Sequence, residues 1–268
     1  MKKSIALGLI ALLLIGCSTV PITNRKRINL IKDENILPAS FAQYEGFLKE
    51  NKLSANTNKT HEIKQVGMNI SKAVDRFMRA NGMIKEADNY RWEFNLIEDE
   101  NVNAWCLPGG KVVFYEGILP ICKNRDGIAA VMGHEVAHAF AKHGQERMTS
   151  AYGQQLGGIA VAIGTSGESS EKQMLWNTVY GIGSQVGMLA YSRTHETEAD
   201  KLGMVFMIMA GYNPEEAINV WVRMSERAGK NSPPEFLSTH PSNQTRIKNL
   251  RAYLPEAKMH AKKFNSQP

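Results

Sequence analysis

The sequence predicts an α+β fold that is mainly helical, with a small antiparallel sheet packed on a buried helix. Residues 60–80 carry apolar side chains at helical spacing, and the pair Asn81-Gly82 is typical of a helix end. Three β-branched or alternating segments then predict strands, at residues 92–97, 103–107 and 112–115. The chain after these strands has mostly helical spacing, which makes helix the dominant element.

The ends of the other helices are indicated by capping residues. Asp126 is a favourable N-cap for a helix over 127–143, and Gly144 is a favourable stop. Residues 151–190 are rich in Gly, Ala and Met, but their apolar runs are too short for membrane spans, so packed helices are expected. Further helices are expected at residues 35–50 and 193–210, after Asn213-Pro214, and from Ser242.

The N-terminus has the features of an export signal. A short cationic segment, Met1-Lys2-Lys3, precedes an apolar stretch at 5–15 that is too short to span a bilayer comfortably. The box Leu14-Ile15-Gly16-Cys17 follows, and the whole arrangement resembles a bacterial lipoprotein signal. That resemblance implies cleavage before Cys17 and attachment of lipid to it. An ordinary secretory leader or an uncleaved anchor is the alternative.

The same resemblance divides the chain and assigns it a location. Residues 1–16 would be the signal peptide and residues 17–34 a lipid-anchored tether, followed by a folded domain at 35–257 and a polar tail at 258–268. Ser18 is the non-acidic residue that, in such lipoproteins, accompanies sorting to the outer membrane. We therefore expect a protein of the cell envelope, anchored in the outer membrane and facing the periplasm.

The composition excludes several classes of protein. With 268 residues, 43% hydrophobic and 22% charged, the chain is an ordinary globular protein with one substantial core or two small ones. The formal charge of +6 has no accompanying basic and aromatic patch, so no nucleic-acid partner is expected. Cys106 and Cys122 remain if Cys17 carries lipid, and a disulfide and two buried thiols are both open.

The most informative motif is His134-Glu135-Val136-Ala137-His138, which lies in an apolar, helix-forming segment. Residues four apart on a helix share a face, so the two imidazoles can bind one metal ion. Glu135 is then placed to take a proton from a water on that metal. A catalytic zinc needs a third protein ligand from elsewhere. A chance match in an ordinary core helix is the alternative.

The candidate for the third ligand lies in the segment Glu196-Thr197-Glu198-Ala199-Asp200. Glu196 and Asp200 share a helix face, as a ligand and a carboxylate that orients a ligand histidine would. Glu198 points about 160° away from that face and is expected to be solvated. An acidic, solvent-exposed face is the alternative for the whole segment.

Other ligand schemes fit the sequence less well. On a continuous helix His143 points about 140° away from His138 and is expected to interact with the helix dipole instead. His195 points about 100° away from its neighbour Glu196. The metzincin pattern would need Gly at 141 and His at 144, where this chain has Ala141 and Gly144, so that class is excluded.

Together these residues resemble the HtpX/BepA-type zinc metallopeptidases, a gluzincin family that also includes the CAAX-prenyl endopeptidases. The resemblance covers roughly residues 60–255 and implies a zincin-like metalloprotease domain, here at 35–257, with the small sheet packed on the helix that carries the histidines. The matching motifs are His134-Glu135-x-x-His138, Glu196-x-x-x-Asp200, Val102-Asn103-Ala104-Trp105 with Leu107-Pro108-Gly109-Gly110, and Thr239-His240-Pro241 followed by Arg246 and Ile247.

The resemblance implies a role for each residue of the metal site. His134, His138 and Glu196 would bind one Zn²⁺. Glu135 would be the general base, and Asp200 would orient a ligand histidine from the second layer around the metal.

It also implies roles around the substrate. Asn103, Ala104 and Trp105 would form an edge strand that pairs with an extended peptide, although they also fit an ordinary strand start. His240 would either cap the metal as a self-inhibiting fourth ligand or donate to the oxyanion, and a surface His-Pro turn is its bland alternative. Arg246 would donate to the oxyanion or pair with a carboxylate.

The expected function is peptide-bond hydrolysis by a membrane-anchored zinc metalloendopeptidase. Its partners would be unfolded or misassembled cell-envelope proteins as substrates, and a membrane through the lipid anchor. The alternative is a non-proteolytic envelope chaperone or assembly factor with a structural or self-inhibited zinc site. Glu135 discriminates between the two, because a structural site needs no base.

Overall fold

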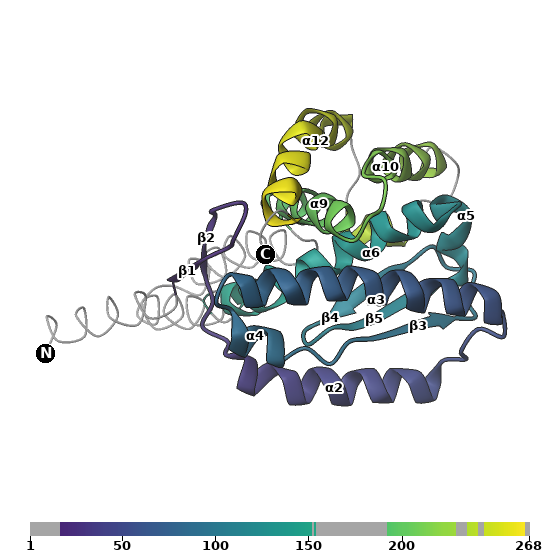
Figure 1. The fold of residues 1–268 in the computed structure, drawn as a ribbon. Coiled ribbons are helices and arrows are strands. Elements are labelled where there is room, and N and C mark those ends of the chain that lie inside the picture. The colour runs from purple at the N-terminus through teal and green to yellow at the C-terminus, as the bar shows by residue number, and fades with distance from the viewer. Residues whose placement is uncertain (1–16, 152, 154–191, 229–234, 241–243, 266–268) are drawn as a thin grey trace, which may run out of the picture.

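The structure is a computed structural model that describes most of the chain (Figure 1). The described residues are 17–151, 153, 192–228, 235–240 and 244–265. The predicted signal peptide at 1–16 and nearly all of the segment 151–190, where packed helices are predicted, lie outside them. Among the described helices, none has both the length and the hydrophobicity that crossing a membrane requires.

Helices dominate the described chain, and the strands form two small sheets, which confirms the predicted mainly helical class. In chain order the elements are β1 (Cys17–Thr19), β2 (Lys26–Ile28), α2 (Asp33–Glu50), α3 (Thr57–Ala80), α4 (Ile84–Asp88), β3 (Glu93–Ile97), β4 (Ala104–Leu107), β5 (Lys111–Tyr115), η1 (Glu116–Ile118), α5 (Leu119–Cys122), α6 (Arg125–Phe140), α9 (Arg193–Met209), α10 (Glu215–Ala228), α11 (Phe236–Thr239) and α12 (Gln244–Asn265).

The three-stranded sheet is mixed, with β5 in the centre, β3 parallel to it and β4 antiparallel to it. The sequence predicts antiparallel pairing throughout. The difference arises because the chain crosses from β3 to the far edge of the sheet and returns through β5. The predicted turn joins β4 to β5, and Gly109 and Gly110 in it both have φ of +86°, a conformation that other residues rarely adopt. This topology makes β4 an edge strand.

Helices cover both faces of this sheet because its side chains alternate between them. Phe94 and Phe114 belong to the main core, together with the buried stripe of α3, and Figure 1 shows α3 lying across the strands. Val113 points to the opposite face, where it packs with Tyr44 of α2 in a smaller core. The helix α6 contacts both α3 and β4 and is buried along almost its whole length.

The bounds of α6 differ from the predicted ones at both ends. Asn124 is the N-cap, and its side chain accepts a hydrogen bond from the backbone N of Gly127 at 2.8 Å. The predicted cap, Asp126, instead accepts from the backbone N of Asn213 at 3.0 Å and so ties α6 to the start of α10. The helix ends at Phe140, earlier than predicted.

Two glycines let α6 and α9 approach at backbone distance. A Cβ atom built on Gly133 of α6 would lie 2.9 Å from the carbonyl oxygen of Gly203 of α9. A Cβ atom built on Gly203 would lie 2.8 Å from the backbone N of His134. Such distances leave no room for a side chain on either glycine. The close crossing brings the histidine face of α6 against the acidic face of α9.

The N-terminal hairpin formed by β1 and β2 packs on the domain. Val20 at its tip is fully buried, and the side chain of Arg27 donates to the carbonyl oxygen of Ala141 at 2.6 Å. The sequence predicts a polar tether at 17–34. The structure instead has this hairpin, followed by the start of α2 at Asp33. The side chains that hold the hairpin follow no helical or strand periodicity, so the sequence does not predict it.

The C-terminal helix α12 runs through most of the predicted polar tail at 258–268. Ala261 and Phe264 are buried there, and the Phe264 ring centroid lies 5.5 Å from that of Phe77. The tail looks polar in the sequence because lysines occupy the solvent-facing positions between the buried ones. The folded domain therefore extends beyond its predicted end.

Both remaining cysteines are free thiols in the structure. Cys106 lies on β4 and Cys122 ends α5. The structure thus has buried or half-buried thiols, and not the disulfide that the sequence left open.

The glycine contact predicts a specific stability effect. We expect Gly203→Ala to lower the free energy of unfolding by about 1–3 kcal/mol, because the added methyl group overpacks the backbone of α6. Urea denaturation measures this change. The matched control is Gly46→Ala in α2, where a Cβ meets nothing within 4 Å and alanine favours the helix. Equal effects of the two substitutions would show that the crossing tolerates a side chain.

Candidate metal centre

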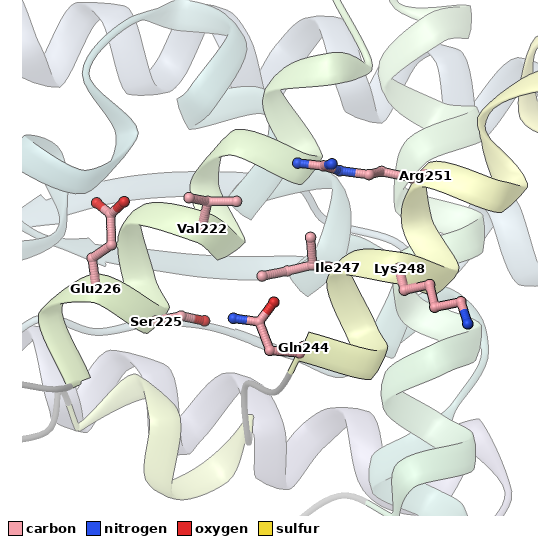
Figure 2. A pocket seen from close by; sticks show the side chains of 7 residues that line it. All are labelled: Val222, Ser225, Glu226, Gln244, Ile247, Lys248 and Arg251. Carbon is pink, nitrogen blue, oxygen red and sulfur yellow. The ribbon is translucent and has the colours of Figure 1, made fainter.

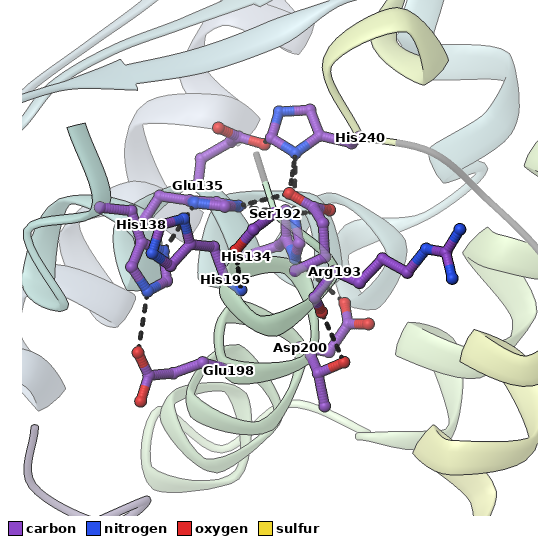
Figure 3. A network of polar contacts seen from close by, with 12 residues as sticks. His134, Glu135, His138, Ser192, Arg193, His195, Glu198, Asp200 and His240 are labelled. Carbon is purple, nitrogen blue, oxygen red and sulfur yellow. Dashed lines mark hydrogen bonds and ion pairs between the residues drawn. The ribbon is translucent and has the colours of Figure 1, made fainter. Parts of the chain in front are cut away.

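Three segments bring the predicted site residues together in a buried centre (Figure 3). The helix α6 contributes His134, Glu135 and His138, and α9 contributes Glu196. His240 follows α11 and points into the same centre. All five side chains are buried, which excludes bulk water and strengthens every charge interaction between them.

Four donor atoms from these residues converge on one point. The Nε2 atoms of His134 and His138 are 3.1 Å apart, and Nδ1 of His240 is 3.2 Å from Nε2 of His134. Oε1 of Glu196 lies 3.3 Å from Nε2 of His138 and 3.0 Å from Nδ1 of His240. A tetrahedral zinc with bonds of about 2.05 Å places neighbouring donors about 3.3 Å apart. The four donors therefore fit a single ion of this size.

The electrostatics of the centre favour a cation. Burial opposes a charge on His134, but hydrogen bonds to Asp200 and Glu196 outweigh it and raise its pKa to about 9. Burial also opposes ionisation of Glu196 and Asp200, yet Arg246 and the histidines hold the pKa of both carboxyls below its ordinary value. Three imidazole nitrogens thus meet an ionised carboxylate, which is the donor chemistry of a zinc site.

Asp200 and Arg246 form the next layer around His134. Oδ1 of Asp200 lies 3.1 Å from Nδ1 of His134 and so can accept a hydrogen bond from it. Arg246 donates to both oxygens of Asp200, at 2.6 and 2.8 Å, and its Nη1 lies 2.7 Å from Oε2 of Glu196. Its guanidinium also lies 3.4 Å above the ring of Trp221. Of the two predicted roles of Arg246, the geometry matches carboxylate pairing.

Glu135 lies beside this donor set and is not one of the four converging donors. Its Oε1 is buried and makes no hydrogen bond within the described residues, and Nε2 of His240 is 3.6 Å away. Burial raises the pKa of the Glu135 carboxyl. A buried carboxylate oxygen without a donor is costly, so this atom is suited to accept a proton or a polar group of a bound molecule.

His240 is held in the centre by aromatic packing. Its ring stacks on Phe236 with centroids 4.5 Å apart, and Phe236 is buried against Trp221. The backbone N of Phe236 donates to the carbonyl oxygen of Val102 at 3.0 Å, just before β4. The same segment therefore covers the donor set and abuts the edge strand. This position does not match the predicted alternative of a surface His-Pro turn.

The predicted substrate strand is the edge of the sheet next to α6. Ala104 is buried, and its backbone N donates to the side chain of Asn103 at 2.9 Å. The indole of Trp105 packs edge-on against Phe47 of α2, and its Nε1 lies 3.3 Å from the hydroxyl of Tyr115. The strand β4 contacts α6, the helix that carries Glu135.

Two residues with no predicted role in the metal site lie beside the converging donors. Glu198 is predicted to be solvated but is buried, and its carboxylate pairs with Arg25 and His143. His143 does not follow the helix, because α6 ends at Phe140 and Lys142 adopts φ of +58°. The chain therefore turns back, and Nδ1 of His143 lies 2.9 Å from Nδ1 of His138.

These two residues belong to a network that the sequence analysis missed. Arg25 of the N-terminal hairpin also donates to Glu146, and Glu146 lies 3.3 Å from Nε2 of His195. Burial opposes the charges, but Arg25 and the histidines lower the pKa of Glu146 and Glu198 to about 2. Gly144 indicates a nearby helix end, but nothing in the sequence links position 25 to position 198.

A separate groove lies between α10 and α12 and has a volume of about 600 Å³ (Figure 2). Its lining includes Ser225, Gln244, Lys248 and Arg251, and none of the converging donors belongs to it. The groove therefore does not belong to the metal centre.

Comparison with known proteins identifies the family. Residues 64–254 match the model of peptidase family M48, which is most of the described domain. The chain belongs to peptidase family M48. This membership confirms the predicted family and the class of metal-dependent proteases. The converging donors and the family therefore both indicate a metal-dependent protease.

Several curated relatives of this M48 protein are named as endopeptidases. It is 34% identical over 243 residues to the mitochondrial metalloendopeptidase OMA1 of Schizosaccharomyces pombe, covering 90% of this chain and 67% of the relative. It is 37% identical over 177 residues to the OMA1 of Saccharomyces cerevisiae, covering 63% and 49%. The β-barrel assembly-enhancing protease of Escherichia coli K12 is 28% identical over 167 residues, covering 60% and 34%. The chain thus spans between about a third and two thirds of these relatives.

These relatives contradict the predicted location. The sequence predicts a lipoprotein of the outer membrane facing the periplasm, whereas the OMA1 relatives from two yeasts, Arabidopsis thaliana and Bos taurus are named as mitochondrial. The Escherichia coli relative matches less of the chain, at lower identity than the yeast proteins. A short cationic and apolar N-terminus says little about which membrane a protein reaches, and that is why the prediction failed.

The buried arginine predicts a second stability effect. We expect Arg246→Met to lower the free energy of unfolding of the metal-free protein by about 3–5 kcal/mol, because Glu196 and Asp200 lose their buried counter-charge. Urea denaturation with and without zinc measures it, and bound zinc should reduce the loss. As a control, Arg79→Met removes only exposed ion pairs and should change little. Similar results for both variants would argue against the buried pairing.

Proposed function

We propose that this M48 protein is a zinc metalloendopeptidase that cleaves unfolded or misassembled proteins. The observation that carries the proposal is the convergence of His134, His138 and Glu196 beside the buried carboxyl of Glu135. Family membership and the endopeptidase relatives support it. A structural metal site would have no use for a second buried acid that is not a ligand at this position.

The proposed metal ligands are His134, His138 and Glu196. Two imidazoles and one carboxylate are a donor set typical of catalytic zinc, which keeps one position open for substrate. When bound, zinc polarises the scissile carbonyl and lowers the pKa of water. Asp200 keeps the proton of His134 on Nδ1 and thereby directs its Nε2 to the metal, while Arg246 holds Asp200 in place.

Glu135 is the proposed general base. Its carboxylate accepts a proton from the attacking water and then donates that proton to the amine that leaves when the peptide bond breaks. Its burial raises the pKa and so makes the carboxylate a stronger base than an exposed one. The side chain is adjacent to the donor set without being part of it, as this proton transfer requires.

The proposed substrate is an extended peptide that adds to the outer edge of β4. The proposed contacts are Asn103, just before β4, and Ala104 and Trp105 at its start, because the backbone of an edge strand can pair with any extended sequence. Such pairing needs a segment that is free of its own secondary structure. Unfolded or misassembled proteins offer such segments, which supports quality control as the biological role.

We propose that His240 caps the centre in the resting state. Its Nδ1 lies within 3.2 Å of both the His134 and the Glu196 donors, so it occupies the position that substrate would need. Its Nε2 faces Glu135 at 3.6 Å, so it also covers the base. Cleavage would then require the segment from Phe236 to His240 to move.

We also propose that Cys17 carries a lipid anchor. The box Leu14-Ile15-Gly16-Cys17 is the observation that supports it. Cys17 begins β1, and the hairpin packs directly on the domain that holds the donors. An anchored chain would therefore hold its metal centre near a membrane surface and near proteins that fail to assemble there.

The central test of the function compares wild type with Glu135→Gln. We expect the purified, zinc-loaded wild type to cleave casein and the variant to lose cleavage by about 100-fold or more while keeping its zinc. Cleavage is measured by release of peptides, and zinc by elemental analysis. The control is Glu215→Gln, which changes an exposed glutamate of α10. Full cleavage by Glu135→Gln would exclude the mechanism, and an inactive wild type would favour a non-proteolytic assembly factor.

Replacing His240 tests the cap. We expect His240→Ala to retain zinc on the other three ligands and to cleave casein faster than wild type, because the open position no longer has an internal occupant. Initial rates at saturating substrate measure the effect. Slower cleavage with zinc retained would instead assign His240 to the oxyanion, and an unchanged rate would contradict both roles.

A further inference from the structure

His143 lies between a proposed metal ligand and a buried acid. Its Nδ1 is 2.9 Å from Nδ1 of His138, and its Nε2 is 2.9 Å from Oε2 of Glu198. The side chain of His143 is fully buried, and that of Glu198 is 3% exposed. In such surroundings no bulk water can satisfy two donors, or two acceptors, that face each other. Each contact must therefore join one donor to one acceptor.

This pairing of donors with acceptors determines where each proton lies. A carboxylate can only accept, so Nε2 of His143 carries a proton and donates to Glu198. The neutral imidazole of His143 then accepts at Nδ1. Nδ1 of His138 must therefore be the donor in the contact between the two rings. The lone pair of His138 is left on Nε2, the atom that converges with the other metal donors.

Arg25 keeps the acid of this chain ionised and in place. Its Nε donates to Oε2 of Glu198 at 2.7 Å, and its Nη1 donates to Glu146 at 2.8 Å. The hydroxyl of Thr23, in the same hairpin, also donates to Glu198. An arginine with this fork geometry binds a carboxylate strongly. The charged end of the chain is therefore supplied by the N-terminal hairpin, far from the ligands in sequence.

We propose that Glu198 and His143 form a hydrogen-bond relay that fixes the tautomer of His138 with its proton on Nδ1, and that Arg25 holds Glu198 for this purpose. The inference rests on the proposed metal site. These three residues, His143, Glu198 and Arg25, are positioning residues. They act through His138 and do not contact the point where the metal donors converge.

The other ligand histidine has a parallel arrangement. Nδ1 of His134 faces Asp200, which Arg246 holds by two hydrogen bonds. Each proposed ligand histidine is thus oriented by an acid and an arginine from outside α6, and His138 differs only by the inserted His143. Partners of this kind typically change metal affinity by about 10–100-fold when removed.

A second metal ion is the competing explanation of the cluster. His143, Glu146 and His195 also have donors close enough to share an ion. Arg25, however, lies 2.5 Å from Glu146 and 2.6 Å from Glu198, so a cation there would have to displace its guanidinium. The observed contacts therefore favour the relay, and metal stoichiometry decides between the two.

The sharpest variant is Glu198→Leu, which removes the acceptor of His143 at similar size. A glutamine would not do this, because Oε2 of Glu198 accepts from both Arg25 and His143, and an amide oxygen could keep both contacts. Without the acceptor, nothing in the relay holds the proton of His143 on Nε2. The matched control is Glu146→Leu, which also removes an ion pair with Arg25 but whose carboxylate lies against His195.

Zinc affinity tests the relay, measured by competition with a chromogenic chelator on full-length, folded protein. We expect Glu198→Leu to weaken zinc binding by about 10–100-fold and Glu146→Leu to stay close to wild type. His143→Leu should weaken binding similarly, and His143→Gln should restore most of it, because glutamine can donate to Glu198 and accept from His138. Unchanged affinity in Glu198→Leu and His143→Leu would overturn the relay, and two zinc ions per wild-type chain would favour the second site.

Nitrogen NMR of the histidines in wild type gives an independent result even if a variant does not fold. We expect His138 protonated on Nδ1, and His143 protonated on Nε2 with Nδ1 unprotonated. A proton on Nδ1 of His143 would overturn the relay. Neither readout depends on cleavage, so an inactive wild type would refute the proposed protease function and leave the relay to be judged by affinity and tautomer alone.

Discussion

The contact between Gly133 and Gly203 sets the distance between α6 and α9, and the geometry of the metal centre depends on that distance. Without side chains at these positions the two backbones meet directly, and His134, the residue after Gly133, comes to lie against the acidic side of α9. A larger spacing would separate the imidazoles from the Glu196 carboxylate. The centre is therefore a product of helix packing as much as of the residues that line it.

Burying so many ionisable groups is costly, and the fold offsets the cost by pairing. Arg246 neutralises the acids of α9, and Arg25 neutralises those around His143. Both arginines come from segments remote from α6 and α9, one near each end of the described chain. The first strands and the last helix thus contribute to the electrostatics of the centre as well as to the core.

Much of the fold and of the metal centre could be predicted from the sequence, but only where the sequence pattern was local. Helical spacing predicted that His134 and His138 share a face, and the resemblance to the family implied Glu196 as the third ligand. The structure places the three side chains around one point. The C-terminal end of α6 and the role of His143 were missed because a left-handed residue, Lys142, turns the chain where helical geometry would have continued. Arg25 could not be found, since its contacts cross more than a hundred residues and follow no period.

The metal centre requires that three imidazoles and one carboxylate converge on a single zinc ion. X-ray absorption spectroscopy of the zinc-loaded, full-length protein tests it most directly, with elemental analysis of the same sample. We expect one zinc per chain with four nitrogen or oxygen neighbours at about 2.0–2.1 Å and the scattering pattern of three imidazoles. A sulfur neighbour, or a chain that holds no zinc, would contradict the site, and a pattern of only two imidazoles would contradict the cap by His240.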